Sequence, residues 1–190
     1  AGTTIAVAQA PQMVVILIVS GDVGGCDERG GETMPSIAKD LTPIALAGIT
    51  GRMGRRIAAL ATAMKCRIVA ALERPGHHLS GQSLAQLGIL EADDPGADVL
   101  IGDTTDRAPL SEARVLLDFT APDALQSLLD ASKRHGLAVV TGTTGLDASH
   151  VAKLDEASGT IPVLHATNFS LGIALLADLA QQAAIVLGEE

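Results

Sequence analysis

The stretch LAGITGRMGRR, residues 46–56, decides the fold that this sequence predicts. It follows a short apolar run, passes through Gly48, Gly51 and Gly54 at intervals of three residues, and continues into a segment with helical periodicity. A glycine-rich turn between a strand and a helix lets backbone N–H groups approach a phosphate closely, and the helix N-terminus adds partial positive charge. The spacing is GxxGxxG rather than GxGxxG, so the pattern alone fits a purely structural turn as well as a dinucleotide site.

On both sides of this turn, short apolar runs alternate with longer segments of helical period. The apolar runs predict buried strands at residues 44–47, 67–72, 115–119, 138–141 and 162–165, with an edge strand at 98–101. The helical segments are residues 54–64, 122–135, 147–158 and 171–187. Connections too long for hairpins imply parallel strands joined by right-handed crossovers. The predicted fold class is therefore α/β, a Rossmann-type doubly wound parallel sheet.

The helix expected at residues 122–135 carries the clearest boundary signals. Thr120 and Asp123 resemble a capping box, and Pro122 stands in the first turn. Basic residues at 133–135 followed by Gly136 end the helix.

Length and composition favour one domain with an extra segment. A chain of 190 residues that is 47% hydrophobic closes one compact core. We assign residues 1–40 to a flexible N-terminal extension, Gly-rich and polar over 21–33, and residues 41–190 to the domain itself. The run MVVILIV, residues 13–19, is too short to span a bilayer and lacks the basic start of a signal peptide.

The charge and the cysteine content exclude several classes of partner. The chain has 22 acidic and 13 basic residues, a formal net charge of −9, which repels nucleic acid and anionic membrane surfaces. Cys26 and Cys66 have no metal-ligand spacing, so we expect neither a disulfide framework nor a zinc site. A reducing, cytoplasmic setting fits best.

Polar residues follow the predicted strands at several places far apart in the chain. Glu73 and Arg74 end the second strand, where an acidic residue accepts ribose hydroxyls and an arginine pairs with a 2′-phosphate or stacks on adenine. Three further loops, at residues 118–120, 142–145 and 167–170, also follow strands. Loops that follow parallel strands emerge at one edge, so we expect all of these to surround one crevice. Simpler explanations remain open for these residues. Glu73 and Arg74 fit a solvated strand end, and Phe119 and Phe169 fit side chains that only fill the hydrophobic core.

Five motifs, LAGITGRMGRR, ALERPG, LLDFTAP, VVTGTTGLD and HATNFSLG, resemble in order and spacing the nucleotide-binding domain of the 4-hydroxy-tetrahydrodipicolinate reductases, also called dihydrodipicolinate reductases. The resemblance covers about residues 43–188. It implies NADH or NADPH as cofactor, with the pyrophosphate region held by Gly48, Ile49, Thr50, Gly51, Arg52 and Met53, and the adenosine ribose by Glu73 and Arg74. It also implies that the nicotinamide end is lined by Gly142, Thr143, Thr144, Ala166, Thr167, Asn168 and Phe169. We add Phe119 to the expected cofactor-binding residues, because it lies in one of the polar loops that follow strands.

The resemblance implies hydride transfer from NAD(P)H to a cyclic 4-hydroxy dicarboxylate, with loss of water, in lysine and diaminopimelate biosynthesis. In the family, a second, substrate-binding domain supplies a His-His and Lys segment and a Ser-Gly-Thr turn, and we expect this chain to lack that domain and to be inactive or slow alone. None of the five histidines stands in that motif, so no catalytic residue and no metal ligand is assigned. Ala121 replaces a basic residue common in the family, which softens NADPH preference, and Thr167 replaces a common alanine.

Two other functions remain open at this point. A stand-alone NAD(P)-sensing or scaffolding module would bind the cofactor without turnover. Another oxidoreductase, such as an amino-acid dehydrogenase, is disfavoured by the GTTG and NFS segments together. The helix at 171–187 is apolar around much of its circumference, so we expect a homo-oligomer.

Overall fold

A computed structural model describes residues 41–188 except 104, 106 and 107. The expectations for residues 1–40, including the extension and the run at 13–19, lie outside the described residues. The elements follow in the order β1 (Thr42–Ala47), α2 (Arg52–Ala61), β2 (Cys66–Leu72), β3 (Ile101–Gly102), the 3₁₀ helix η2 (Leu110–Glu112), β4 (Val115–Asp118), α3 (Pro122–His135), β5 (Ala138–Thr141), α4 (Ala148–Ser158), β6 (Val163–His165) and α5 (Leu171–Leu187).

The strands form one six-stranded sheet in the order β3-β2-β1-β4-β5-β6, and every pair within it is parallel. The chain builds outward from β1 to β3, then returns to β4 on the other side of β1 and builds outward again. This reversal between β1 and β4 is the switch point at which doubly wound sheets bind ligands. The predicted α/β class and the parallel, doubly wound arrangement are therefore confirmed.

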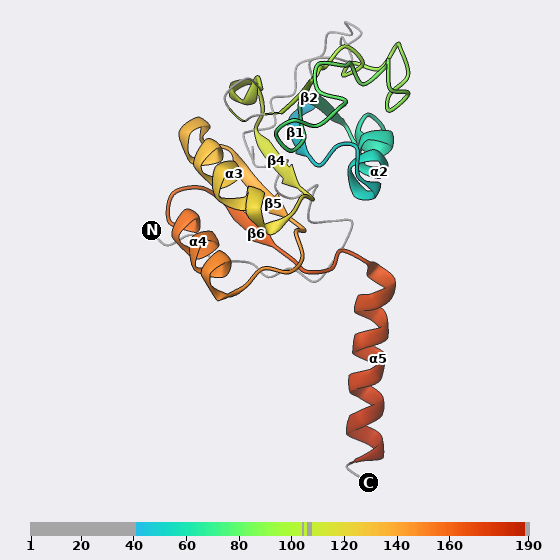
Figure 1. The fold of residues 1–190 in the computed structure, drawn as a ribbon. Coiled ribbons are helices and arrows are strands. Elements are labelled where there is room, and N and C mark those ends of the chain that lie inside the picture. Colours follow the sequence, from blue (N-terminus) through green and yellow to red (C-terminus); the bar gives the residue numbers. More distant parts are fainter. Residues whose placement is uncertain (1–40, 104, 106–107, 189–190) are drawn as a thin grey trace, which may run out of the picture.

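The two faces of the sheet carry separate hydrophobic clusters. One cluster packs alternate strand residues such as Ile44 and Leu46 against Ala58 of α2 and Leu84 of the segment before β3. The other packs the intervening residues against α3 and α4 (Figure 1). Because both faces are covered, strands such as β4 are buried at every position, which explains their continuous apolar runs.

Most predicted elements agree with the structure to within two or three residues, and α3 and α5 begin and end where they were expected. The edge strand expected at 98–101 is an exception, since β3 is only Ile101–Gly102. The carbonyls of Ala97 and Val99 accept instead from Ala85 and Leu84. The preceding segment therefore pairs with its own loop, and only its last residues reach β2.

The capping box predicted from Thr120 and Asp123 is wrong. The N-cap of α3 is Ala121, which makes no side-chain cap, and the Thr120 hydroxyl donates instead to Asp118 at 2.6 Å. A capping box does occur at α4. There the Asp147 carboxylate accepts from the backbone of Ser149 and His150, and the His150 ring faces the Asp147 backbone N–H.

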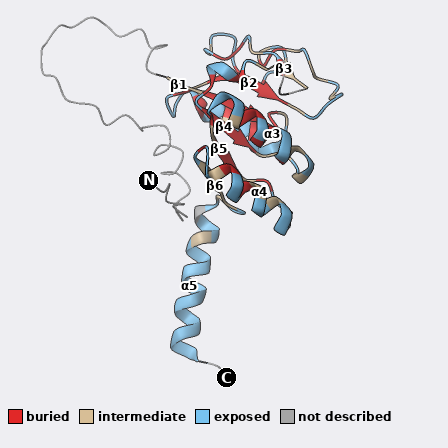
Figure 2. Ribbon diagram, turned by 90° about the vertical axis from the view of Figure 1, so that its left-hand side faces the viewer, coloured by how far each residue is buried: buried red, intermediate tan, exposed pale blue. Residues whose placement is uncertain are grey.

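Helix α5 extends away from the sheet and its flanking helices (Figures 1 and 2). Its large apolar side chains are exposed, among them Leu176 at 62% and Val186 at 83%. No helix within the described part of the chain is long and apolar enough to span a membrane.

Candidate functional site

The carboxyl ends of the strands lie level, so the loops that follow them share one edge. Ala47 pairs with Leu72 and with Asp118, and Thr141 pairs with Asp118 and with His165. The first residue of each loop continues the strand pairing with a backbone hydrogen bond to the end of the neighbouring strand. The N–H groups of Gly48, Glu73, Phe119, Gly142 and Ala166 donate to the carbonyls of Leu72, Gly102, Ala47, Asp118 and Thr141, respectively. The predicted convergence of five polar loops at one rim of the sheet is what the structure shows.

The glycine turn occupies the switch point between β1 and β4. Gly48 has a φ of +79°, and a Cβ atom there would stand 2.6 Å from the carbonyl oxygen of Phe119. At Gly54 a Cβ atom would overlap the backbone of Gly48 and Ile49. Side chains are therefore excluded from both positions, which lets α2 begin directly against the end of β1.

The N-terminus of α2 suits an anionic ligand. Its N-cap, Gly51, makes no side-chain cap, and its first turn holds no acidic residue. The first N–H groups of a helix have no intrahelical partner and carry partial positive charge. Arg52 and Met53, both exposed, stand in this first turn. The first turn of α2 therefore offers backbone donors with no acidic side chain of its own, which fits the pyrophosphate of a dinucleotide. The amide of Thr50, in the preceding turn, is already bonded to Glu73.

Glu73 lies against the glycine turn. One carboxylate oxygen, Oε1, accepts from both the amide N (2.8 Å) and the hydroxyl (2.7 Å) of Thr50. The Arg55 side chain donates to the Thr50 carbonyl at 3.1 Å. The residue expected at the ribose and the turn expected at the pyrophosphate are therefore joined directly, while Arg74 is exposed next to them.

Asp118 organises the next two loops, and sequence reasoning did not single it out as a site residue. Its side chain is fully buried; Oδ1 accepts from the amide N and hydroxyl of Thr120, at 3.1 and 2.6 Å. Oδ2 accepts from the hydroxyls of Thr141 (2.7 Å) and Thr143 (3.0 Å). An aspartate that ends an otherwise apolar strand, followed by Phe-Thr, was the available signal. Its partners were not visible, because two of them lie 23 and 25 residues away.

The two phenylalanines meet above Gly142. Their ring centroids are 5.6 Å apart in an edge-to-face arrangement, and both rings pack partly buried against the core cluster on the α2 face. A Cβ atom at Gly142 would overlap the ring of Phe119 and approach that of Phe169 to 3.0 Å. The rings thus belong both to the core and to the rim. Filling the core and lining a ligand site are therefore compatible roles for these two residues.

The remaining predicted residues lie in the loops after β5 and β6. Thr144, Thr167 and Asn168 are exposed. The Asn168 side chain accepts from the amide of Ser170 at 2.9 Å, and Ser170 in turn caps α5. These exposed polar groups have donors and acceptors available to a ligand at the rim.

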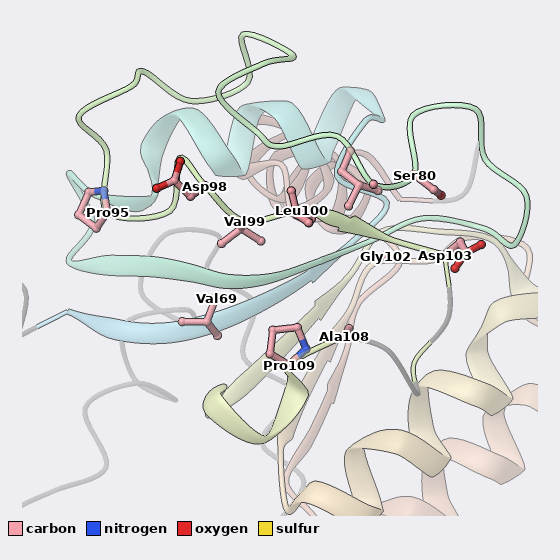
Figure 3. A pocket seen from close by; sticks show the side chains of 12 residues that line it. Val69, Ser80, Pro95, Asp98, Val99, Leu100, Gly102, Asp103, Ala108 and Pro109 are labelled. Atoms are coloured by element: carbon pink, nitrogen blue, oxygen red, sulfur yellow. The ribbon is translucent and has the colours of Figure 1, made fainter.

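A separate groove of about 690 Å³ lies beside β3 (Figure 3). It is lined by apolar residues such as Val69, Val99 and Pro109, with Asp98 and Asp103 toward opposite ends. Two carboxylates repel the phosphates of a dinucleotide. None of the residues expected to bind the cofactor is among the described residues that line this groove.

Metal and thiol chemistry find no support in the described residues. No group of three or more potential ligands that could hold a metal ion occurs there. Cys66 is buried without a disulfide, and burial raises the pKa of its thiol, which keeps it protonated.

The strand order, the glycine turn at the switch point and the acidic residue after β2 define a Rossmann-type NAD(P)-binding domain. Residues 42–169 match the family described as "Dihydrodipicolinate reductase, N-terminus". The chain belongs to this family, as its motifs predicted.

Curated relatives agree. The chain is 41% identical over 149 residues to a 4-hydroxy-tetrahydrodipicolinate reductase of Alkalilimnicola ehrlichii, covering 78% of this chain and 54% of the relative. It is 37% identical over 154 residues to the protein of that name from Rhizobium meliloti, covering 77% and 59%. The chain thus spans little more than half the length of these relatives.

A solved structure with the same fold is lactate dehydrogenase from Eimeria maxima with NADH and oxamate. The likeness has a TM-score of 0.50 at 17% sequence identity and covers 66% of this chain and 43% of that one. At that identity it shows the fold alone.

Proposed function

We propose that this chain provides the NAD(P)H-binding domain of a reductase that converts 4-hydroxy-tetrahydrodipicolinate to tetrahydrodipicolinate in lysine and diaminopimelate biosynthesis. The observation that carries the proposal is the convergence of the glycine turn, Glu73 and the loops at Asp118, Gly142 and Asn168 at one rim of the sheet. Membership of the dihydrodipicolinate reductase family supports the choice of reaction.

The residues divide the work along the rim. The α2 N-terminus holds the pyrophosphate, and Glu73 with Arg74 holds the adenosine ribose. The loops after β4, β5 and β6 orient the nicotinamide, with Phe119 and Phe169 limiting access of water to its ring. The reduced nicotinamide supplies a hydride when bound. Recognition of the cyclic dicarboxylate and donation of the proton belong, in this proposal, to residues outside 41–188.

The experiment is a titration of the whole chain with NADH and NADPH, followed by nicotinamide fluorescence. The sequence has no Trp or Tyr, so protein emission does not interfere. The informative variant is Gly51→Asp. Gly51 has an extended backbone (φ −69°, ψ 168°) at the α2 N-cap, a position that Asp favours. A Cβ atom there would stand 3.2 Å from the Gly48 carbonyl oxygen, so the turn must shift slightly, and the new carboxylate lies in the pyrophosphate site. A like charge that close weakens binding by about tenfold or more.

The matched control is Ala63→Asp, which adds the same charge at an exposed position beyond the other end of α2. We expect it to bind like the parent. Unchanged binding by Gly51→Asp, or no binding of either cofactor by the parent, would contradict the proposal. Adding 4-hydroxy-tetrahydrodipicolinate to the cofactor-loaded chain then separates binding with turnover from binding alone, as in a sensing or scaffolding module.

A further inference from the structure

We propose that Thr50 is a positioning residue that holds Glu73 in place and thereby makes the site select NADH over NADPH. This inference rests on the proposed function, because it concerns how the adenosine end of the same cofactor is recognised. The observation behind it is a double hydrogen bond from one residue of the glycine turn to one oxygen of the carboxylate after β2.

The contact is specific in its geometry. Thr50 directs its amide N and its hydroxyl at the same oxygen, Glu73 Oε1, at 2.8 and 2.7 Å. Both hydrogen bonds are partly buried and span 23 residues of chain. The Thr50 carbonyl is held in turn by the Arg55 side chain at 3.1 Å. Thr50 is thus fixed on both sides, and it restrains the position and rotamer of Glu73.

One oxygen of Glu73 remains for a ligand. No described residue donates to Oε2, and an ionised carboxylate oxygen accepts two hydrogen bonds. The adjacent 2′ and 3′ hydroxyls of an unmodified adenosine ribose are donors suited to that oxygen. With Oε1 already bonded, Oε2 is presented at a fixed place, so the ribose of NADH binds without reordering the side chain.

A 2′-phosphate meets the opposite situation. It brings one and a half to two negative charges, as phosphate monoesters do near neutral pH, against a carboxylate that cannot swing away without losing both bonds to Thr50. Arg74, exposed beside Glu73, attracts the phosphate and offsets part of this repulsion. The strength of the Thr50 contact therefore decides how fully Glu73 opposes NADPH.

The alternative is that Thr50 only stabilises the turn, in which case losing its hydroxyl weakens both cofactors equally. The discriminating quantity is the ratio of the Kd for NADPH to the Kd for NADH, measured by nicotinamide fluorescence on the whole chain. For the parent we expect a ratio of about ten or more. Thr50→Val keeps the shape and the amide hydrogen bond but removes the hydroxyl, and we expect it to lower the ratio by about threefold to tenfold.

Two further substitutions complete the test. Thr50→Ser restores the hydroxyl and should return the ratio to that of the parent. Glu73→Gln keeps an acceptor for Thr50 without the charge, and should lower the ratio at least as far as Thr50→Val, mainly through tighter NADPH binding. If Thr50→Val does not fold, Glu73→Gln still tests the inference.

The matched control is Thr62→Val, which removes another threonine hydroxyl bonded to a carboxylate, that of Asp94 at 2.8 Å, away from the rim. It should leave the ratio unchanged. A parent that prefers NADPH, or equal weakening of both cofactors by Thr50→Val, overturns the inference while the proposed function stands. A parent that binds neither cofactor overturns the proposed function, and the inference with it.

Discussion

Removing the charge of Asp118 should destabilise the whole domain, although the residue carries no predicted chemistry. Its buried carboxylate accepts four hydrogen bonds, from Thr120 twice and from Thr141 and Thr143. A hydrogen bond to a charged group contributes about 1 kcal/mol more than a neutral one, so neutralising four of them costs about 4 kcal/mol. A neutral amide is cheaper to bury than a carboxylate, which offsets part of this cost. We expect Asp118→Asn to lower the free energy of unfolding by about 2 kcal/mol.

Asp118→Ala should cost more. It leaves the hydroxyls of Thr141 and Thr143, which are 0% and 2% exposed, without their acceptor. Each buried unsatisfied hydroxyl costs about 1–3 kcal/mol, so a loss of about 4 kcal/mol is expected. Both variants also release the loops after β4 and β5 from each other, so cofactor binding should weaken in Asp118→Asn even under conditions where it is fully folded.

Urea unfolding followed by far-UV circular dichroism measures these losses, since the chain has no Trp or Tyr to report by fluorescence. Asp118→Asn should move the midpoint down by about 1 M with little change in slope. Asp130→Asn is the control, because that carboxylate also accepts hydrogen bonds, from Gln126, but is exposed on α3. It should stay within about 0.5 kcal/mol of the parent. Equal midpoints for the parent and Asp118→Asn would refute the reasoning.

Three other predictions concern packing, pH and association. Gly54→Ala should destabilise the domain by about 2 kcal/mol in the same urea assay, because the overlap of its Cβ with the rigid backbone of Gly48 outweighs the higher helix propensity of alanine; a more stable variant would contradict this. Hydrogen bonds from Ser149, then His150, lower the pKa of Asp147 in the folded state, so this stabilisation is present above the unfolded value of about 3.9 and is lost as the pH falls below it. Between about pH 6 and about pH 3, Asp147→Asn should therefore lose less free energy of unfolding than the parent. Parallel curves of unfolding free energy against pH for the two proteins would exclude the effect. The exposed apolar side chains of α5 should cause self-association, so the mass measured by light scattering should rise with protein concentration. Leu176→Lys should suppress this rise, whereas Gln181→Lys, on the polar side of the helix, should not. A constant monomer mass for the parent would rule out the self-association.

Local signals in the sequence were enough for the architecture. Apolar runs bounded by turns predicted the strands, and Pro122 with Gly136 predicted both ends of α3, because these signals act within a few residues. The order of five motifs predicted the family. Parallel connections predicted that the polar loops would share one edge, and the hydrogen bonds from each loop to the neighbouring strand bear this out.

Contacts between distant residues were decided only by the tertiary structure. Thr120 has the sequence signature of a cap, yet its hydroxyl donates to Asp118, which the sheet buries beside Thr141. The Thr50 to Glu73 contact joins residues 23 positions apart whose side chains meet only because β1 and β2 pair in a particular register. Periodicity and capping describe what one segment prefers, whereas hydrogen-bond partners are set by which strands lie side by side. The sequence therefore determined the sheet and its rim, and packing determined which polar groups on that rim hold one another.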